Sequence, residues 1–261
     1  MTGEFSTGWL SLREPADADA RAAELLDPLR SALKGRPELV IRDLGCGTGS
    51  LGRWLAPRLP GPQRWIMEDR DPALLAYAAT HMPVAAEVTV ETRLGDVTAV
   101  TATDLAGTDL VTCSALLDIL TAAEVDALAA ACAGARCAAL LTLSVIGEVR
   151  VEPADPLDRE IAEAFNAHQR RSHGTRRLLG PDAAAAAVRA FEGVGAAVSV
   201  AASPWRLGPE RSALTAEWLD GWLAAAAEQR PDLPVDAYRE RRRRSDLVVT
   251  VGHTDVLAIF D

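Results

Sequence analysis

Residues 40–59, VIRDLGCGTGSLGRWLAPRL, decide the fold of this chain. Gly45, Gly47 and Gly49 occupy every second position between a short apolar run and a segment of helical character. Glycine weakens a helix or strand, because it loses more backbone freedom on folding than any other residue. Without a Cβ, however, such a loop approaches a ligand closely, and the helix that follows it offers free N–H groups. The stretch therefore predicts a strand, a ligand-binding turn and a helix.

Strands and helices alternate on both sides of this turn. We expect strands at 38–45, 63–69, 87–96, 108–115 and 137–145, with helices at 50–59, 71–82 and 121–135 between them. This rhythm is typical of a parallel sheet covered by helices on both faces. Beyond residue 147 we expect an inserted helix ending near Gly174, a helix at 181–191, a strand at 194–202, a long helix at 215–230 and a last strand at 245–260.

The length of 261 residues and an apolar content of 49% suit one large α/β domain. No linker divides the chain, so residues 1–261 are expected to form one domain. Its start is interpreted as a loop with Trp9, followed by a helical segment at 17–34 that is kinked or split at Pro28. Residues 1–34 would form an N-terminal helical cap.

The net charge of −10 makes nucleic acid an unlikely partner, because an acidic chain repels phosphates. The arginine run at 239–244 is interpreted as the solvated end of a helix in preference to a phosphate patch. The first residues do not resemble a signal peptide, and no apolar stretch is long enough to span a membrane. We expect a cytoplasmic protein that binds no membrane.

The cysteines, Cys46, Cys113, Cys132 and Cys137, form no C-x-x-C pair and have no clustered histidines near them in sequence. A metal site is therefore not expected. The simplest interpretation is buried free thiols in a reducing compartment.

Four segments occur in the order of a known family. DLGCGTGS at 43–50 resembles motif I of the class I S-adenosylmethionine-dependent methyltransferases. WIMEDRDPALL at 65–75, RLGDV at 93–97 and DLVTCSALLDIL at 109–120 resemble its later motifs. The resemblance covers residues 38–146, and the rest fits only by layout. It implies a Rossmann-like three-layer α/β sandwich, with a mostly parallel seven-stranded sheet and an antiparallel last strand.

The resemblance also implies S-adenosylmethionine as cofactor and assigns roles to residues. The glycine loop would pack against the methionine portion, an acid after the second strand would bind the ribose hydroxyls, and Asp96 would bind the adenine amine. Glu68 and Asp69 compete for the ribose, and the spacing to Pro72 favours Asp69. Arg13 is either a partner of the methionine carboxylate or part of a surface salt bridge. The expected cofactor-binding residues are Asp43, Gly45, Cys46, Gly47, Gly49, Glu68, Asp69, Asp96, Val97, Cys113 and Arg13.

The methyl acceptor is expected to be a small molecule, with oxygen as the first-choice atom. The segment TCSALLD at 112–118 lacks the proline and aromatic residue of enzymes that methylate exocyclic base amines. The insert at 147–190 would form the substrate wall. His168 of this insert is the candidate general base, because histidine titrates near neutral pH. The alternative is that His168 is a surface histidine without a role.

Further substrate contacts are expected from two other places. Asn166 and Gln169 are i,i+3 neighbours and share a helix face. Trp205 and Arg206 follow the sixth strand, where substrates enter; a solvated loop arginine is the alternative for Arg206.

Three alternatives stay open at this level. The chain could methylate a nucleic acid or protein, use the cofactor for other chemistry, or bind it without catalysis. A nicotinamide dehydrogenase is disfavoured, because Ser50 stands where G-x-G-x-x-G needs its third glycine. The acceptor and the oligomeric state are not determined by the sequence.

Overall fold

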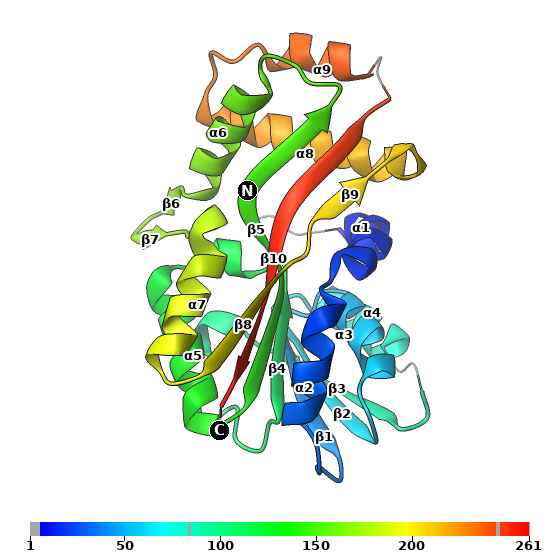
Figure 1. The fold of residues 1–261 in the computed structure, drawn as a ribbon, viewed down its shortest axis with the longest axis vertical. Coiled ribbons are helices and arrows are strands. Elements are labelled where there is room, and N and C mark those ends of the chain that lie inside the picture. The colour runs from blue at the N-terminus through cyan, green and yellow to red at the C-terminus, as the bar shows by residue number, and fades with distance from the viewer. Residues whose placement is uncertain (1–5, 83–84, 244–245, 261) are drawn as a thin grey trace.

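A twisted mixed sheet forms the centre of the computed structural model, which describes residues 6–82, 85–243 and 246–260 (Figure 1). Its strand order is β3-β2-β1-β4-β5-β10-β8. The strands from β3 to β5 are parallel, and β10 runs antiparallel to both β5 and β8. The predicted fold class is therefore confirmed. The bounds are β1 Leu39–Leu44, β2 Gln63–Asp69, β3 Val88–Leu94, β4 Leu110–Ser114, β5 Ala138–Glu152, β8 Ala197–Ala202 and β10 Val248–Ile259.

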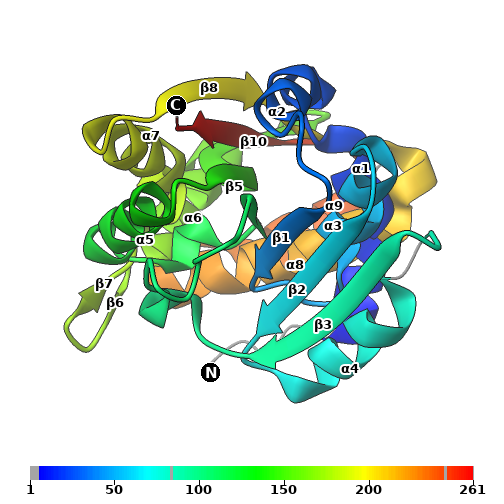
Figure 2. The same cartoon turned by 90° about the horizontal axis from the view of Figure 1, so that it is seen from below.

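Helices cover both faces of this sheet, as the view from below shows (Figure 2). On one face α2, α3 and α4 enclose a core that includes Leu29, Ile41 and Trp65. On the other face α5 and α7 enclose a second core around Leu128 and Phe191. The helix bounds are α2 Leu26–Ala32, α3 Ser50–Leu55, α4 Pro72–His81, α5 Ala122–Ala135 and α7 Ala183–Gly193.

A third core lies beyond the sheet, where β5 and β10 continue as a long antiparallel pair (Figure 1). This pair extends until Glu152 lies opposite Val248. Trp205, Trp222 and Tyr238 are buried there, and Trp218 stacks on Trp222 at 5.2 Å. The elements around it are α1 Thr7–Ala20, α6 Asp158–Gln169, β9 Trp205–Leu207, α8 Ser212–Gln229 and α9 Val235–Arg243.

The N-terminal cap differs from the prediction. Helix α1 begins at Thr7, where a loop was expected, because the Ser6 side chain accepts a hydrogen bond from the Trp9 N–H and caps the helix. The helix ends at Ala20, because Arg21 has a ψ of 133°, outside the helical range, and Pro28 does not kink it. Pro28 lies in the first turn of α2, which tolerates proline because the N–H groups there need no partner in the helix.

The insert differs in detail as well. Strand β5 runs to Glu152, beyond its expected end, because β10 supplies hydrogen-bond partners along its whole length. The inserted helix ends at Gln169, and a short hairpin of β6 (Ser172–His173) and β7 (Arg176–Arg177) turns at Gly174. The last strand begins at Val248 among the described residues; its expected start at 245 lies outside them.

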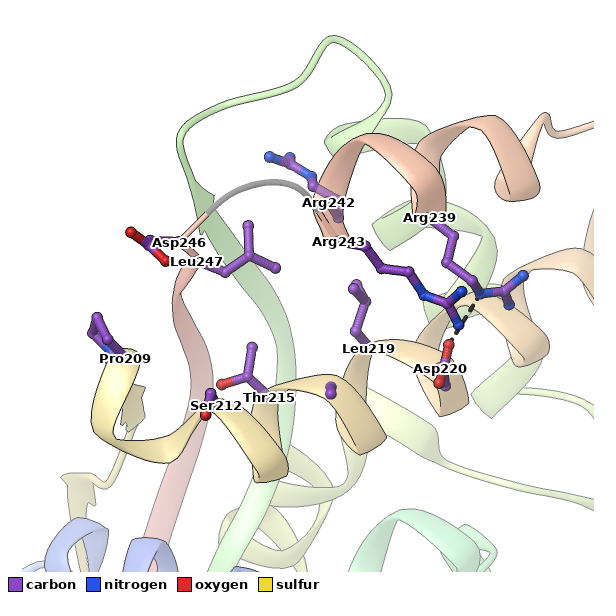
Figure 3. A pocket seen from close by; sticks show the side chains of 11 residues that line it. Pro209, Ser212, Thr215, Leu219, Asp220, Arg239, Arg242, Arg243, Asp246 and Leu247 are labelled. Atoms are coloured by element: carbon purple, nitrogen blue, oxygen red, sulfur yellow. Dashed lines mark hydrogen bonds and ion pairs between the residues drawn. The ribbon is translucent and has the colours of Figure 1, made fainter.

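The arginine run of α9 is bound into the structure. Arg239 donates to Asp220 at 3.0 Å, and the buried Arg242 pairs with Asp158. These ion pairs tie α9 to α8 and α6, so the run is more than a solvated helix end. A cavity of about 420 Å³ lies between α8, α9 and the start of β10 (Figure 3), and none of the candidate site residues lines it. Arg244 lies outside the described residues.

None of the helices in residues 6–82, 85–243 and 246–260 is long and apolar enough to cross a membrane. The same residues contain no cluster of three potential metal-ligating side chains.

Candidate active site

The glycine loop joins the end of β1 to α3. Gly45, Gly47 and Gly49 all have positive φ, between 54° and 84°, which side chains other than glycine rarely adopt. A Cβ on Gly45 would lie 2.8 Å from Leu116, in the loop after β4. The loop is therefore shaped for glycine both by its backbone and by its neighbours.

The N-terminal helix α1 lies over this loop. A Cβ on Gly47 would come within 3.4 Å of Leu10. One turn further along α1, Glu14 accepts from the Arg53 guanidinium of α3 at 2.8 Å. The cap is thus bound to the helix that follows the glycine loop.

The two acids at the end of β2 face in opposite directions, as neighbouring strand residues do. The Asp69 carboxylate accepts from the backbone N–H groups of Gly47, at 2.8 Å, and Asp71, at 3.0 Å. Glu68 is buried and accepts from Arg42 at 2.6 and 2.9 Å. Asp69 therefore lies against the glycine loop, whereas Glu68 is held in an internal ion pair.

A buried carboxyl and a buried guanidinium flank the loop with unmet hydrogen bonds. Asp43 is 1% exposed; its Oδ1 accepts from Thr112, and its Oδ2 has no partner among the described residues. Arg21 is 4% exposed; it donates weakly to Ser50 and Ser114, and its Nε and Nη1 have none. Burial raises the pKa of Asp43 to about 7 and lowers the pKa of Arg21. Such groups are costly to bury unpaired, so this place is suited to a polar ligand.

Comparison with known proteins agrees with this geometry. A methyltransferase domain family model matches residues 41–136, from β1 to the end of α5. This stretch contains the four segments that resemble motifs of the class I S-adenosylmethionine-dependent methyltransferases. No protein of curated function matches the sequence.

Solved structures share the fold of this chain at low identity. The YcgJ protein of Bacillus subtilis is 12% identical at a TM-score of 0.51, over 92% of this chain and 100% of that one. The cyclopropane synthase MmaA2 of Mycobacterium tuberculosis is 11% identical at a TM-score of 0.52, over 98% and 95%.

The remaining expected cofactor residues lie along the same edge of the sheet. Asp96 is exposed after β3 and caps a short turn by accepting from Thr98 N–H at 2.9 Å, and Val97 begins that turn. Cys46 and Cys113 are buried, and burial raises the pKa of both thiols. Both cysteines are thus neutral thiols beside the loop.

Arg13 and Trp205 are engaged with each other and with α1. Arg13 pairs with Asp17 at 2.9 Å, and its guanidinium lies 4.9 Å from the Trp205 ring centre. The Trp205 indole donates to the same Asp17 at 2.9 Å. Arg206, the next residue on β9, is exposed. Arg13 therefore already has an anionic partner, unlike Arg21.

The candidate residues of the insert lie on α6. The Asn166 amide donates to Gly147 O at 2.8 Å, and its Oδ1 is buried with no partner in the described chain; the same holds for Gln169 Oε1. His168 Nε2 lies 3.2 Å from Glu228 of α8. Burial and the neighbouring Arg171 lower the pKa of His168, against the opposing effect of Glu228.

Two further candidate residues, Arg21 and Asp118, were missed in the sequence. Arg21 looked like any residue of an N-terminal helix, and only its burial distinguishes it from Arg13. Asp118 lies within a segment that resembles the family, four residues beyond β4. Burial raises the pKa of Asp118 to about 6, although a hydrogen bond from its own backbone N–H and the charges of Arg13 and Arg171 oppose the shift. An acid just beyond the end of a parallel strand was the available signal, because ligands of α/β proteins bind at that edge.

Proposed function

We propose that this methyltransferase transfers the methyl group of S-adenosylmethionine to an oxygen atom of a small molecule. The observation that carries the proposal is the unsatisfied pair of Arg21 and Asp43 on either side of the glycine loop. Their chemistry matches an amino-acid end group, because a carboxylate pairs with guanidinium and an ammonium pairs with carboxylate. The residues present therefore fit the cofactor.

Further cofactor contacts follow from the same edge of the sheet. Arg21 would hold the methionine carboxylate and Asp43 the ammonium. Asp69 retains free lone pairs for the ribose hydroxyls, because each of its oxygens accepts only one backbone N–H. Asp96 and Val97 would border the adenine. Glu68 is a poor ribose ligand, because Arg42 occupies it.

The cofactor supplies an already activated methyl group when it is bound. The work of the chain is then to hold the acceptor in line and to exclude water, which together supply roughly 7–11 kcal/mol in well-oriented reactions. Helix α1 covers one side of the loop through Leu10, and the extension of β5 with α6 borders the acceptor side.

A small acceptor is favoured by the charge of −10 and by the ion pairs that occupy the arginine run. Asn166 and Gln169 offer buried carbonyl oxygens that lack donors, and these suit an acceptor with O–H or N–H groups. Arg206 on β9 is exposed and is proposed as an outer contact, whereas the neighbouring Trp205, also expected as a contact, is buried. The free, buried cysteines support work in the reducing cytosol.

Histidine 168 is the base predicted from the sequence, and the prediction is tested by His168→Ala. Turnover should fall by about 10²-fold or more if the imidazole takes the proton of the acceptor. Glu228 and Arg171 already contact the His168 ring, so a second candidate base should be tested as well.

Thermal shift tests the cofactor, and product analysis tests the reaction. S-Adenosylmethionine and S-adenosylhomocysteine should both raise the melting temperature, and NAD should not. At about 100 times the dissociation constant the stabilisation is about 2.7 kcal/mol. A metabolite extract treated with the enzyme and cofactor should then show a product heavier by one methyl group. No shift with either sulfur compound at millimolar concentration would overturn the proposal.

A further inference from the structure

Asp118 lies beside the proposed cofactor site, in a turn that follows β4. Ser114, at the end of β4, contacts Arg21, and Leu116 packs against Gly45. Asp118 comes two residues later, in the short 3-10 turn Leu117–Ile119. The loop that carries it therefore borders the glycine loop directly.

The turn is anchored by its other residues and not by the Asp118 carboxyl. Leu117 and Leu120 are 1% exposed in the second core. The Leu120 carbonyl accepts from Leu179 N–H at 2.8 Å, and the Ile119 carbonyl accepts from Arg176. Within the described chain the Asp118 carboxyl forms no hydrogen bond or ion pair with another residue. The carboxyl accepts a hydrogen bond from its own backbone N–H, and it keeps further lone pairs for a donor from outside the turn.

The guanidinium groups of two residues on different elements interact with this carboxyl through Coulomb attraction. Arg13 comes from α1, one turn beyond the Leu10 that touches the glycine loop, and Arg171 follows α6. Neither lies within 4 Å of Asp118, so the carboxyl stands between two cations without being neutralised by direct contact. α1, α6 and the loop after β4 are also the elements that border the acceptor side.

We propose that Asp118 is the general base of the reaction and that the acceptor is an acidic hydroxyl group, a phenol or an enol. The inference rests on the proposed transfer to oxygen. The acceptor O–H bond breaks, its proton goes to an Asp118 carboxylate oxygen, and its electron pair stays on oxygen. That oxygen forms the new bond to the methyl carbon, while the electrons of the broken sulfur–carbon bond stay on sulfur. Asp118 then loses its proton to water.

The acidity of the hydroxyl follows from the strength of this base. A carboxyl with a pKa of about 6 is mostly ionised at neutral pH and is a weak base. A phenol such as that of tyrosine has a pKa of about 10, roughly four units above that of Asp118. The hydroxyl of water, by contrast, has a pKa near 15.7. Asp118 therefore suits a phenol or enol far better than a simple alcohol, and the two guanidinium groups favour negative charge developing on the acceptor.

The test uses the full chain with a panel of phenols, enols, aliphatic alcohols and amines, and detects a one-methyl mass gain. Wild-type protein should methylate phenols or enols. Asp118→Asn and Asp118→Ser should lower that rate by about 100-fold or more, and Asp118→Glu should recover part of it. Asp126→Asn, on the exposed face of α5, is the matched control and should keep the wild-type rate.

Calorimetry with S-adenosylhomocysteine and a melting curve accompany each variant. The Asp118 variants should bind within threefold of wild type and stay folded. Wild-type protein that fails to bind would overturn the proposed function itself. Protein that binds but methylates only alcohols or amines, or nothing in the panel, overturns the acceptor class. A full rate in Asp118→Asn, with loss in His168→Ala, overturns Asp118 as the base.

Discussion

The proposed cofactor side and the proposed acceptor side of this protein are built in different ways. Around the glycine loop, the polar groups come from successive strand ends, and Asp43, Asp69 and Asp96 follow β1, β2 and β3 in order. On the acceptor side, the groups come from α1, the loop after β4, α6 and β9, which are far apart in the chain (Figure 1). The spacing of the sequence is thus enough to propose roles for the residues around the glycine loop. Roles for the residues of the acceptor side can be proposed only from their contacts in the structure.

The largest expected effect breaks the glycine loop. Gly47→Val should abolish detectable binding of S-adenosylhomocysteine, because valine at a φ of 54° is strained and its side chain would fill ligand space beside Leu10. Gly107→Val is the matched control, since its φ is 75° and no atom lies within 4 Å of its Cβ. Calorimetry and circular dichroism should show both variants folded and only Gly107→Val binding. Normal binding by Gly47→Val would mean that the loop does not touch the cofactor.

The next prediction separates the two acids of β2. Glu68→Ala should lower the free energy of unfolding by about 3–5 kcal/mol, because Arg42 would be left buried and unpaired. Its cofactor affinity, measured below the melting transition, should change little. Asp69→Ala should do the reverse and weaken binding by roughly 1.5–3 kcal/mol. Denaturant unfolding with calorimetry on both variants checks the contrast, and a reversed order would place Glu68 at the ribose.

A third prediction tests which arginine holds the methionine carboxylate. Arg21→Met should weaken S-adenosylhomocysteine binding by roughly 1.5–3 kcal/mol, the usual value of a charge-assisted hydrogen bond. The melting temperature of the free protein should not fall, because the substitution removes the buried Arg21 guanidinium, whose Nε and Nη1 donors have no partner. Arg13→Met is the paired variant and should change the affinity less than threefold, since Asp17 already binds Arg13. A large loss in Arg13→Met alone would favour the prediction made from the sequence.

The smallest expected effect is a pH dependence. The pKa of Asp43 is about 7 in the free protein, raised by burial, and a bound ammonium group would lower it. The complex then holds fewer protons than the free protein, so affinity rises with pH up to about 7 and flattens above it. Between pH 6 and 7.5 the gain should be roughly tenfold at most, because one proton is released. Calorimetry in Asp43→Asn should show no such slope; an equal slope there would assign it to another group.

The unfolding free energy of the unliganded protein should depend on Asp43 in the opposite direction. The folded-state pKa lies above the unfolded value of 3.8, so the folded state binds more protons between these values. The contribution of Asp43 is therefore complete below about pH 4 and is lost as the pH rises through about 7. The difference between wild type and Asp43→Asn isolates it from the other carboxyls.

The sequence by itself determined the fold class and the order of the cofactor-side motifs. Strand alternation, the glycines of 45–49 and the spacing from Asp69 to Pro72 each lie within a short segment. Local periodicity and turn geometry are encoded at that range, and the sheet confirms them. The individual cofactor roles stay predictions, although the opposite facing of Glu68 and Asp69 supports the choice made from spacing.

Only the tertiary structure decided which charged groups are buried, paired or free. Arg13 and Arg21 lie two helical turns apart in one segment, yet Asp17 pairs with the first, whereas the second is buried beside the glycine loop. Asp118 is similarly ordinary in sequence, and its raised pKa depends on burial among distant segments. Desolvation and Coulomb interactions are set by whatever surrounds a group in space, and neighbours brought from α1, α6 and β10 have no signature at the residue itself.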